Sequence, residues 1–276
     1  RVLDTLTMLG NEPTRLDLIG ALRSCSALSA YRRRYQGALS LQNVADFLLF
    51  SRDFPRSLRF AIASIDTLLH EISGVPSGNF SNEAERLTGS ALAQLNFSGI
   101  ESFLADGLHE SIDQLQRKLI EVGQSMHSAL SAMCAVEDFA SDELDDHEHF
   151  ILFSRNWSSS VCTCINMARE NARMVRDQLS EEIWVELNNL YLYLNAPTLP
   201  EKFNIDPQSF FRRIIRFSLV FQGLSDATIH HDEGWRFMSL GRYLERSDQT
   251  SRVLDTLTML GNEPTRLDLI GALRSC

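Results

Sequence analysis

The sequence predicts an all-α fold, a helical bundle built from two diverged helical halves. Apolar residues recur at helical spacing along most of the chain, and no segment shows the two-residue alternation of a strand with any clarity. The chain has 276 residues, 44% of them hydrophobic and 22% charged, which is typical of a globular protein able to bury a core without disulfides or metals. We therefore expect helix in more than about 60% of residues, against roughly a third in an average protein.

Charge and hydropathy argue against several classes of partner. The net charge of −10 argues against a general nucleic-acid-binding protein, which needs a basic surface. No run of about eighteen apolar residues is present, so no membrane span is expected. The few cysteines are too scattered for a disulfide framework, and we expect reduced thiols in a cytoplasmic protein. Because no phosphate-binding glycine loop or metal-ligand spacing is found, no cofactor and no metal is predicted.

The two ends of the chain have the same sequence: residues 1–25 recur unchanged at 252–276. Natural repeats drift because only their core positions are constrained, so identity at every position indicates another origin. We interpret the chain as a 251-residue unit that is entered in the middle and followed past its own starting point. One copy of each segment is then surplus. We expect packing at Leu16–Leu22 and at Val253, and exposure at Val2 and at 267–273.

Helix start and stop signals divide the first part of the chain. Asp53 is expected to cap one of these helices, because its side chain can accept from the free backbone N–H groups of a first turn. The expected elements are a helix over 16–36 that ends in three arginines, a buried helix over 41–50, a helix capped by Asp53 that runs to about Ser73, a loop over 74–79, an amphipathic helix over 81–95, and one long or two stacked helices over 100–133.

The second part follows an acidic segment, and we divide the chain there into 1–136, an acidic connector at 137–149, and 150–276. Ser180 is expected to cap a helix whose first turn is acidic, and Asp232 is expected to cap the last one. The expected elements are helices over 160–179 and 181–194, a Pro-containing break over 195–200, a helix over 207–223, and a helix over 235–255.

An internal duplication is indicated within the chain. The segment Phe47–Leu58 aligns with Phe150–Val161 at a constant offset of 103, and the apolar, aromatic and serine positions match. We therefore predict that the two segments are equivalent elements of two homologous helical halves. On this interpretation, 1–136 holds the second-half helices, and 150–276 holds the first-half helices plus the helix over 235–255.

The helix over 235–255 has two contrasting faces. One carries apolar residues together with Ser247 and Ser251, whose small side chains allow another helix to approach closely. The other carries charged residues three and four positions apart, which suits ion pairs along a helix. The charged or polar residues of interest on this helix are Arg242, Glu245, Arg246, Asp248 and Arg252.

A second group of such residues lies at 168–177. Two interpretations of the two groups stay open. One is an ion-pair network that stabilises helix packing. The other is a polar cleft in which arginines hold carboxylates or phosphates and Glu245 accepts or orients a proton. The residues of this second group are Arg169, Glu170, Asn171, Arg173 and Arg176.

Four motifs together resemble the bacterial alpha-E domain family: Gly-Trp-Arg-Phe-Met-Ser-Leu-Gly-Arg-Tyr-Leu-Glu-Arg-Ser-Asp at 234–248, Ala-Arg-Glu-Asn-Ala-Arg-Met-Val-Arg-Asp at 168–177, Glu-Ile-Trp-Val-Glu-Leu-Asn at 182–188, and Phe-Pro-Arg-Ser-Leu at 54–58. The resemblance covers nearly the whole 251-residue unit, in a rearranged order. It implies an all-helical domain, and it implies that the ten residues named above match two family helices.

The resemblance also implies partners. Members of the family are typically encoded beside a circularly permuted ATP-grasp ligase and a transglutaminase-like protein. We therefore expect an accessory domain that cooperates with an ATP-grasp-type peptide or amide ligase and binds its peptide or the partner enzyme. Two alternatives are an enzyme acting on amide or peptide bonds with Glu245 as acid/base, and a structural helical scaffold.

Overall fold

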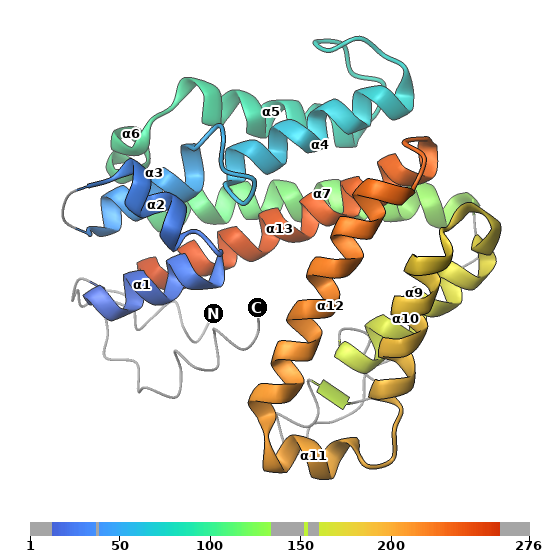
Figure 1. The fold of residues 1–276 in the computed structure, drawn as a ribbon. Helices are drawn as coiled ribbons and strands as arrows, with labels where there is room; N and C mark the ends of the chain where they lie inside the picture. The colour runs from blue at the N-terminus through green and yellow to red at the C-terminus, as the bar shows by residue number, and fades with distance from the viewer. Residues whose placement is uncertain (1–12, 37–38, 134–151, 154–159, 260–276) are drawn as a thin grey trace. The chain divides into compact units, whose positions relative to one another are not determined.

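The computed structural model is built of α-helices and describes residues 13–36, 39–133, 152–153 and 160–259. Helix makes up 80% of these residues and none of them lies in a strand, so the all-α prediction is confirmed. The chain forms two compact units, one from residues 1–134 together with 236–276 and one from 135–235 (Figure 1). Of the described residues, 236–259 thus belong with the first unit, whereas the division predicted from the sequence placed them with 150–235.

The first unit begins with helices whose starts are set by polar caps. Thr14 and Asp17 form a reciprocal capping box, and Ser40, Ser57 and Asn82 each accept a hydrogen bond from a first-turn amide of the helix that follows. These caps satisfy amides that have no partner within the helix. The helices are α1 (Arg15–Ser24), α2 (Leu28–Arg34), α3 (Leu41–Phe50), α4 (Leu58–Ser73), α5 (Glu83–Phe97), α6 (Ile100–Ala105) and α7 (Leu108–Met133).

Two of the expected boundaries are wrong. The single helix expected over 16–36 is broken between α1 and α2, where Ser26 adopts a positive φ of 51° that no α-helix can contain. Asp53 does not cap the next helix. Ser57 does so, because its hydroxyl accepts from the Phe60 amide while it also donates to the Ser51 carbonyl 2.5 Å away.

Helix α5 packs against both α4 and α7, and the three helices form much of the first core (Figure 1). The loop expected at 74–79 is present, and Gly74 begins it with a φ of 71°, a left-handed conformation that favours glycine at a helix C-terminus. Fully buried apolar side chains line the three helices at helical spacing. They include Leu58, Ile62, Ile65, Ala91, Leu95, Ile112, Leu115 and Val122.

Helix α13 (Glu233–Met259) contains the predicted 235–255 segment, and its residues from Arg236 onward belong to the first unit. Figure 1 draws it beside α7, and the His109 imidazole of α7 lies 2.6 Å from the Asp255 carboxylate. The Thr250 hydroxyl donates to the Arg56 carbonyl at 2.9 Å. As predicted, Ser247 and Ser251 lie on the buried face, both with no exposed surface.

The second unit contains α9 (Val161–Met174), the short 3-10 helix η1 (Arg176–Gln178), α10 (Glu181–Leu194), α11 (Leu199–Ile205) and α12 (Pro207–Thr228). Ser180 caps α10 as expected. The break expected at 195–200 is shorter, because Pro200 is accommodated in the first turn of α11, where its missing N–H costs nothing. An apolar core packs α10, α11 and α12 around Phe203 and Phe210.

The two units repeat one order of helices. In the first, α4 and α5 are followed by short α6 and long α7; in the second, α9 and α10 are followed by short α11 and long α12. Ser57 and Ser160, 103 positions apart, both cap the first helix of the series, and both are fully buried. An internal duplication predicts this correspondence. Of the aligned segments, residues 150–151 and 154–159 lie outside the described residues.

The identical ends contribute different parts. From the first copy the structure describes Pro13–Cys25, in which Leu18 and Leu22 are buried although Leu16 is 79% exposed. From the second it describes 252–259, in which Val253 is buried as expected. Val2 and 267–273, where exposure was expected, lie outside the described residues.

If Ser57 and Ser160 are equivalent N-caps, they should contribute similar amounts to the free energy of unfolding. We expect Ser57→Ala and Ser160→Ala each to lower the free energy of unfolding by about 1 kcal/mol, since each removes a first-turn acceptor. Each substitution also removes a donor, since the Ser57 hydroxyl donates to the Ser51 carbonyl and the Ser160 hydroxyl donates to the Thr163 hydroxyl. Urea unfolding measures both, with exposed Ser102→Ala as a control. An unchanged midpoint for Ser160→Ala would contradict the equivalence.

Candidate functional site

The polar face of α13 carries the residues that the sequence analysis singled out. Glu245 is exposed and makes no ion pair with any residue in the described part of the chain. Arg242 and Arg246 are half-buried, and their guanidinium carbons lie 5.6 and 5.7 Å from the centre of the Tyr243 ring between them. Phe60 of α4 lies against the same ring. Both arginines thus make a cation–π contact with the same aromatic ring.

Further toward the C-terminal end of α13, the same face carries an ion pair between two residues of the helix. The Arg252 Nε donates to the Asp248 carboxylate at 2.6 Å, four residues earlier in the helix. Nearer the start of the helix, the Arg236 Nε lies 3.0 Å from the Glu71 carboxylate at the end of α4. The structure therefore brings Arg242 and Arg246 together around Tyr243, and it joins Asp248 to Arg252. Glu245 is left pointing to solvent.

The second predicted group lies on α9 and just beyond it. Arg169 is the most constrained member: its Nε donates to the Asn188 side chain at 2.9 Å, and its guanidinium lies 4.3 Å from the Tyr191 ring centre and 5.7 Å from that of Trp184. Its Nη1 also pairs with Glu170 at 2.9 Å. The contacts with Asn188, Tyr191 and Trp184 tie α9 to α10, whereas the ion pair with Glu170 lies within α9.

The remaining members of this group are peripheral. Arg173 pairs with Glu170 at 3.4 Å, and Asn171 is exposed. Arg176 lies beyond the end of α9, where it stacks on Trp184 and donates to the Leu179 carbonyl. This group belongs to the second unit and the α13 group belongs to the first.

A buried acidic cluster that the sequence analysis missed lies between α4 and α5. Glu85 has no exposed surface, and its carboxylate accepts from the Ser81 amide at 2.6 Å, the Ser81 hydroxyl at 2.8 Å and the Asn82 side chain at 3.0 Å. Asp66 and His70, one turn apart on α4, lie 3.8 Å from each other. The spacing of Asn82 and Glu85 is that of a capping box, and this was the signal available in the sequence.

The environment shifts the pKa values of the two carboxyl groups in opposite directions. Burial raises the pKa of Asp66, and nearby Glu85 adds to this, although His70 acts against it. Burial also acts to raise the pKa of Glu85, but hydrogen bonds from Ser81 and Ser73 and the proximity of His70 outweigh it. The pKa of Glu85 therefore lies below its ordinary value, and Glu85 stays ionised inside the protein.

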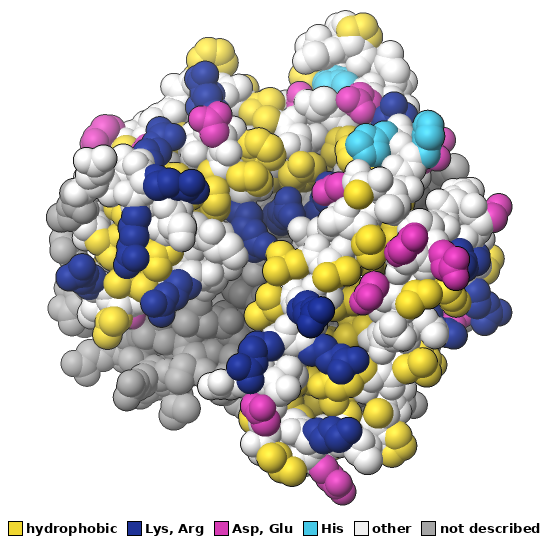
Figure 2. All heavy atoms as spheres, in the orientation of Figure 1, with side chains coloured by type: hydrophobic (Ala, Val, Ile, Leu, Met, Phe, Trp, Pro, Cys, Tyr) yellow, Lys and Arg dark blue, Asp and Glu magenta, His cyan; other side chains and the backbone are white. Residues whose placement is uncertain are grey.

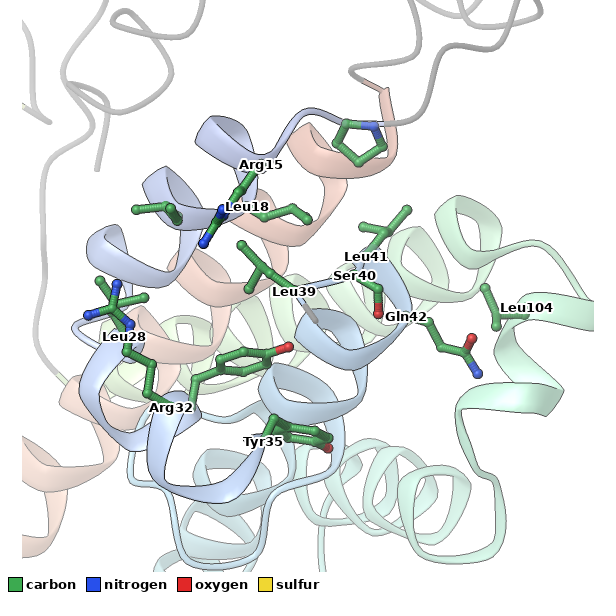
Figure 3. Close-up of a pocket in the computed structure, with 13 residues that line it drawn as sticks. Arg15, Leu18, Leu28, Arg32, Tyr35, Leu39, Ser40, Leu41, Gln42 and Leu104 are labelled. Atoms are coloured by element: carbon green, nitrogen blue, oxygen red, sulfur yellow. The ribbon is translucent and has the colours of Figure 1, made fainter. Parts of the chain in front are cut away.

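A second missed feature is a cavity of about 710 Å³ formed by α1, α2 and α3 (Figure 3). Most of its wall is apolar, from leucines on all three helices and from Leu104 of α6. Arg15 and Arg32 line it from α1 and α2, and Tyr31 and Tyr35 add two aromatic rings. The sequence contained a signal in Tyr31-Arg-Arg-Arg-Tyr35, which could bind an anion, but a basic last turn that suits the helix dipole is the more ordinary interpretation of this motif.

Two other features have simple structural roles. Asp232 caps α13 as predicted, because its carboxylate accepts from the Trp235 amide at 3.2 Å, and the neighbouring His231 ring stacks on Trp235. In the described ranges, no three His, Cys, Asp or Glu side chains gather as a metal-ligand set. None of the helices described is both long and apolar enough to cross a membrane.

Comparison with known proteins identifies the family. The family model of Alpha-E, described as a predicted alpha-helical domain with a conserved ER motif, matches residues 1–129 and 123–276. The dipeptide Glu-Arg, in this order, occurs twice in this chain, at 85–86 on α5 and at 245–246 on α13. No curated protein matches the chain, and no solved structure does. The two matched segments together span the whole sequence, and the chain belongs to the Alpha-E family.

Proposed function

We propose that this Alpha-E domain is an accessory domain of an ATP-grasp-type peptide or amide ligase, and that it binds the peptide or the ligase through the polar face of α13. The observation that carries the proposal is the arrangement of Arg242, Tyr243 and Arg246, with Glu245 beside them at the surface. Two guanidinium groups held at fixed positions suit carboxylate recognition, because each offers a planar pair of N–H donors.

Exposure of Glu245 favours binding over catalysis. An acid/base residue works within hydrogen-bond reach of a positioned substrate, usually in a concave pocket. The described cavity is lined by α1, α2, α3 and α6 and does not include Glu245. A charged, rigid surface patch is more typical of a docking site, where charge complementarity sets the encounter rate and the register.

The experiment measures ligase turnover with and without the domain, using the ATP-grasp ligase encoded beside it. We expect the domain to raise turnover, and we expect Arg242→Gln with Arg246→Gln to weaken that effect about tenfold or more, since each lost charge-assisted contact costs about 1.5–3 kcal/mol. Exposed Glu121→Gln on α7 is the matched control for Glu245→Gln.

Each outcome separates the alternatives. Glu245→Gln should change affinity for the ligase or peptide while leaving the maximal rate at saturating domain unchanged. If Glu245→Gln abolishes turnover while binding survives, the domain is an enzyme and Glu245 is its acid/base. If the arginine variants change only the melting temperature, the domain is a structural scaffold.

A further inference from the structure

We propose that the cavity between α1, α2 and α3 binds an amphipathic carboxylate, that is, a carboxylate next to a bulky aliphatic or aromatic group. This site is separate from the α13 face, and it needs no ligase. Its volume of about 710 Å³ lies within the range of small-molecule sites, which are mostly apolar with a few polar groups that fix orientation. The apolar lining would contact the bulky group of the ligand, and the arginines would bind its carboxylate.

The charge around the cavity is opposite to that of the whole chain. Residues 13–59 contain eight arginines and three aspartates, with no lysine or glutamate, in a protein whose net charge is −10. Figure 2 shows basic side chains around a hydrophobic patch over α1 and α2. A basic region in an acidic chain attracts anions to this place rather than to the protein as a whole.

Two of the arginines line the cavity itself. Arg15 and Arg32 are exposed at its edge, and neither forms an ion pair with any residue that the structure describes. Figure 3 places both at the α1–α2 side, with Gln42 and Leu104 at the opposite side. The aspartates nearby are engaged elsewhere: Asp17 caps α1, and Asp46 accepts from the Tyr35 hydroxyl. A carboxylate at this edge would therefore meet guanidinium groups free to bind it.

The independent observation is the Tyr31 hydroxyl. Tyr31 is 2% exposed and lines the cavity. The Asn43 side chain and the Ser40 backbone lie near enough to its hydroxyl oxygen to act against the rise of its pKa caused by burial, yet the hydroxyl completes no hydrogen bond with a described residue. A buried polar group without a partner costs about 1–3 kcal/mol, so such a group calls for an explanation. The Tyr35 hydroxyl is not available to a ligand in the same way, because it donates its hydrogen bond to the Asp46 carboxylate. Burial and Asp46 raise the pKa of Tyr35 to about 12. Tyr31 is left to donate to a ligand.

Calorimetric titration of the full chain tests the site with N-acetyl-phenylalanine, with N-acetyl-phenylalanine amide, and with a tripeptide ending in phenylalanine. We expect saturable binding of the two acids and at least about tenfold weaker binding of the amide, because only the acids offer a carboxylate to arginine. Tighter binding of the tripeptide would assign the site to peptide C-termini, and equal binding would assign it to small carboxylates.

The variants separate a ligand site from a structural one. Arg15→Gln and Arg32→Gln should each weaken binding about tenfold, whereas Arg23→Gln, an exposed arginine of α1 that does not line the cavity, should not. Tyr31→Phe should weaken binding several-fold without lowering the melting temperature, since the hydroxyl completes no hydrogen bond with a described residue of the fold. A lower melting temperature with unchanged affinity would overturn the proposal. So would equal binding of acid and amide, equal binding of inorganic phosphate, or no binding.

Discussion

Glu85→Ala is expected to lower the free energy of unfolding by about 3 kcal/mol, because it removes an ionised acceptor of three hydrogen bonds from a buried position. The Ser81 amide and hydroxyl and the Asn82 side chain would lose their partner at the start of α5. His70 would also lose a neighbouring negative charge. Urea unfolding followed by circular dichroism measures the change.

Glu83→Ala on the same turn is the control. Glu83 is exposed and pairs only with Arg86, also exposed, so its loss should leave the unfolding midpoint close to that of the unchanged protein. Equal effects of the two substitutions on the free energy of unfolding would show that the buried hydrogen bonds of Glu85 do not stabilise the fold.

Lowering the pH should reduce the difference in the free energy of unfolding between the unchanged protein and Glu85→Gln. The folded-state pKa of Glu85 is below the ordinary value of 4.5, so its stabilising effect is complete above that pH and is lost as the pH falls through the folded-state value. Asp66 has a raised folded-state pKa, so its effect on stability depends on pH in the opposite direction. The protonated carboxyl favours the folded state, and this stabilisation is lost as the pH rises from the ordinary value of 3.8 through the folded-state pKa. Unfolding midpoints between pH 3 and 7, for Glu85→Gln and Asp66→Asn, test both signs.

Ser251→Leu is the second substitution from which we expect a large loss of stability. Ser251 lies on the buried face of α13 with no exposed surface, and its hydroxyl is satisfied within the helix by the Asp248 carbonyl at 2.8 Å. A leucine there would push α13 away from its neighbours, which costs about 1–3 kcal/mol or more in a closely packed core. Thermal unfolding should show the lower melting temperature.

Gly241→Ala is the matched control on the same helix. Gly241 is exposed, and a Cβ placed there meets no atom within 4 Å. We expect this substitution to raise stability by about 0.5–1 kcal/mol, since alanine favours a helix interior over glycine. If Ser251→Leu were as well tolerated as Gly241→Ala, the close approach of α13 to its neighbours would be disproved.

Local sequence determined the helices, their faces and several of their ends. Helix α3 has the bounds expected for it, and Ser180 and Asp232 cap α10 and α13 as predicted. The placement of Ser247 and Ser251 on the buried face of α13 also followed from helical spacing. These features depend on interactions within about four residues, so a single sequence contains the information needed to predict them.

Tertiary structure decided what depends on contacts between distant residues. The choice of Ser57 over Asp53 as a cap rests on the path of the chain from α3 to α4, where Ser57 also bonds Ser51. The burial of Glu85 requires α4 beside α5, and the cavity that joins Arg15 to Arg32 requires the break at Ser26 between α1 and α2. A polar residue reads as solvent-exposed in a sequence, because the groups that satisfy or surround it come from elsewhere in the fold.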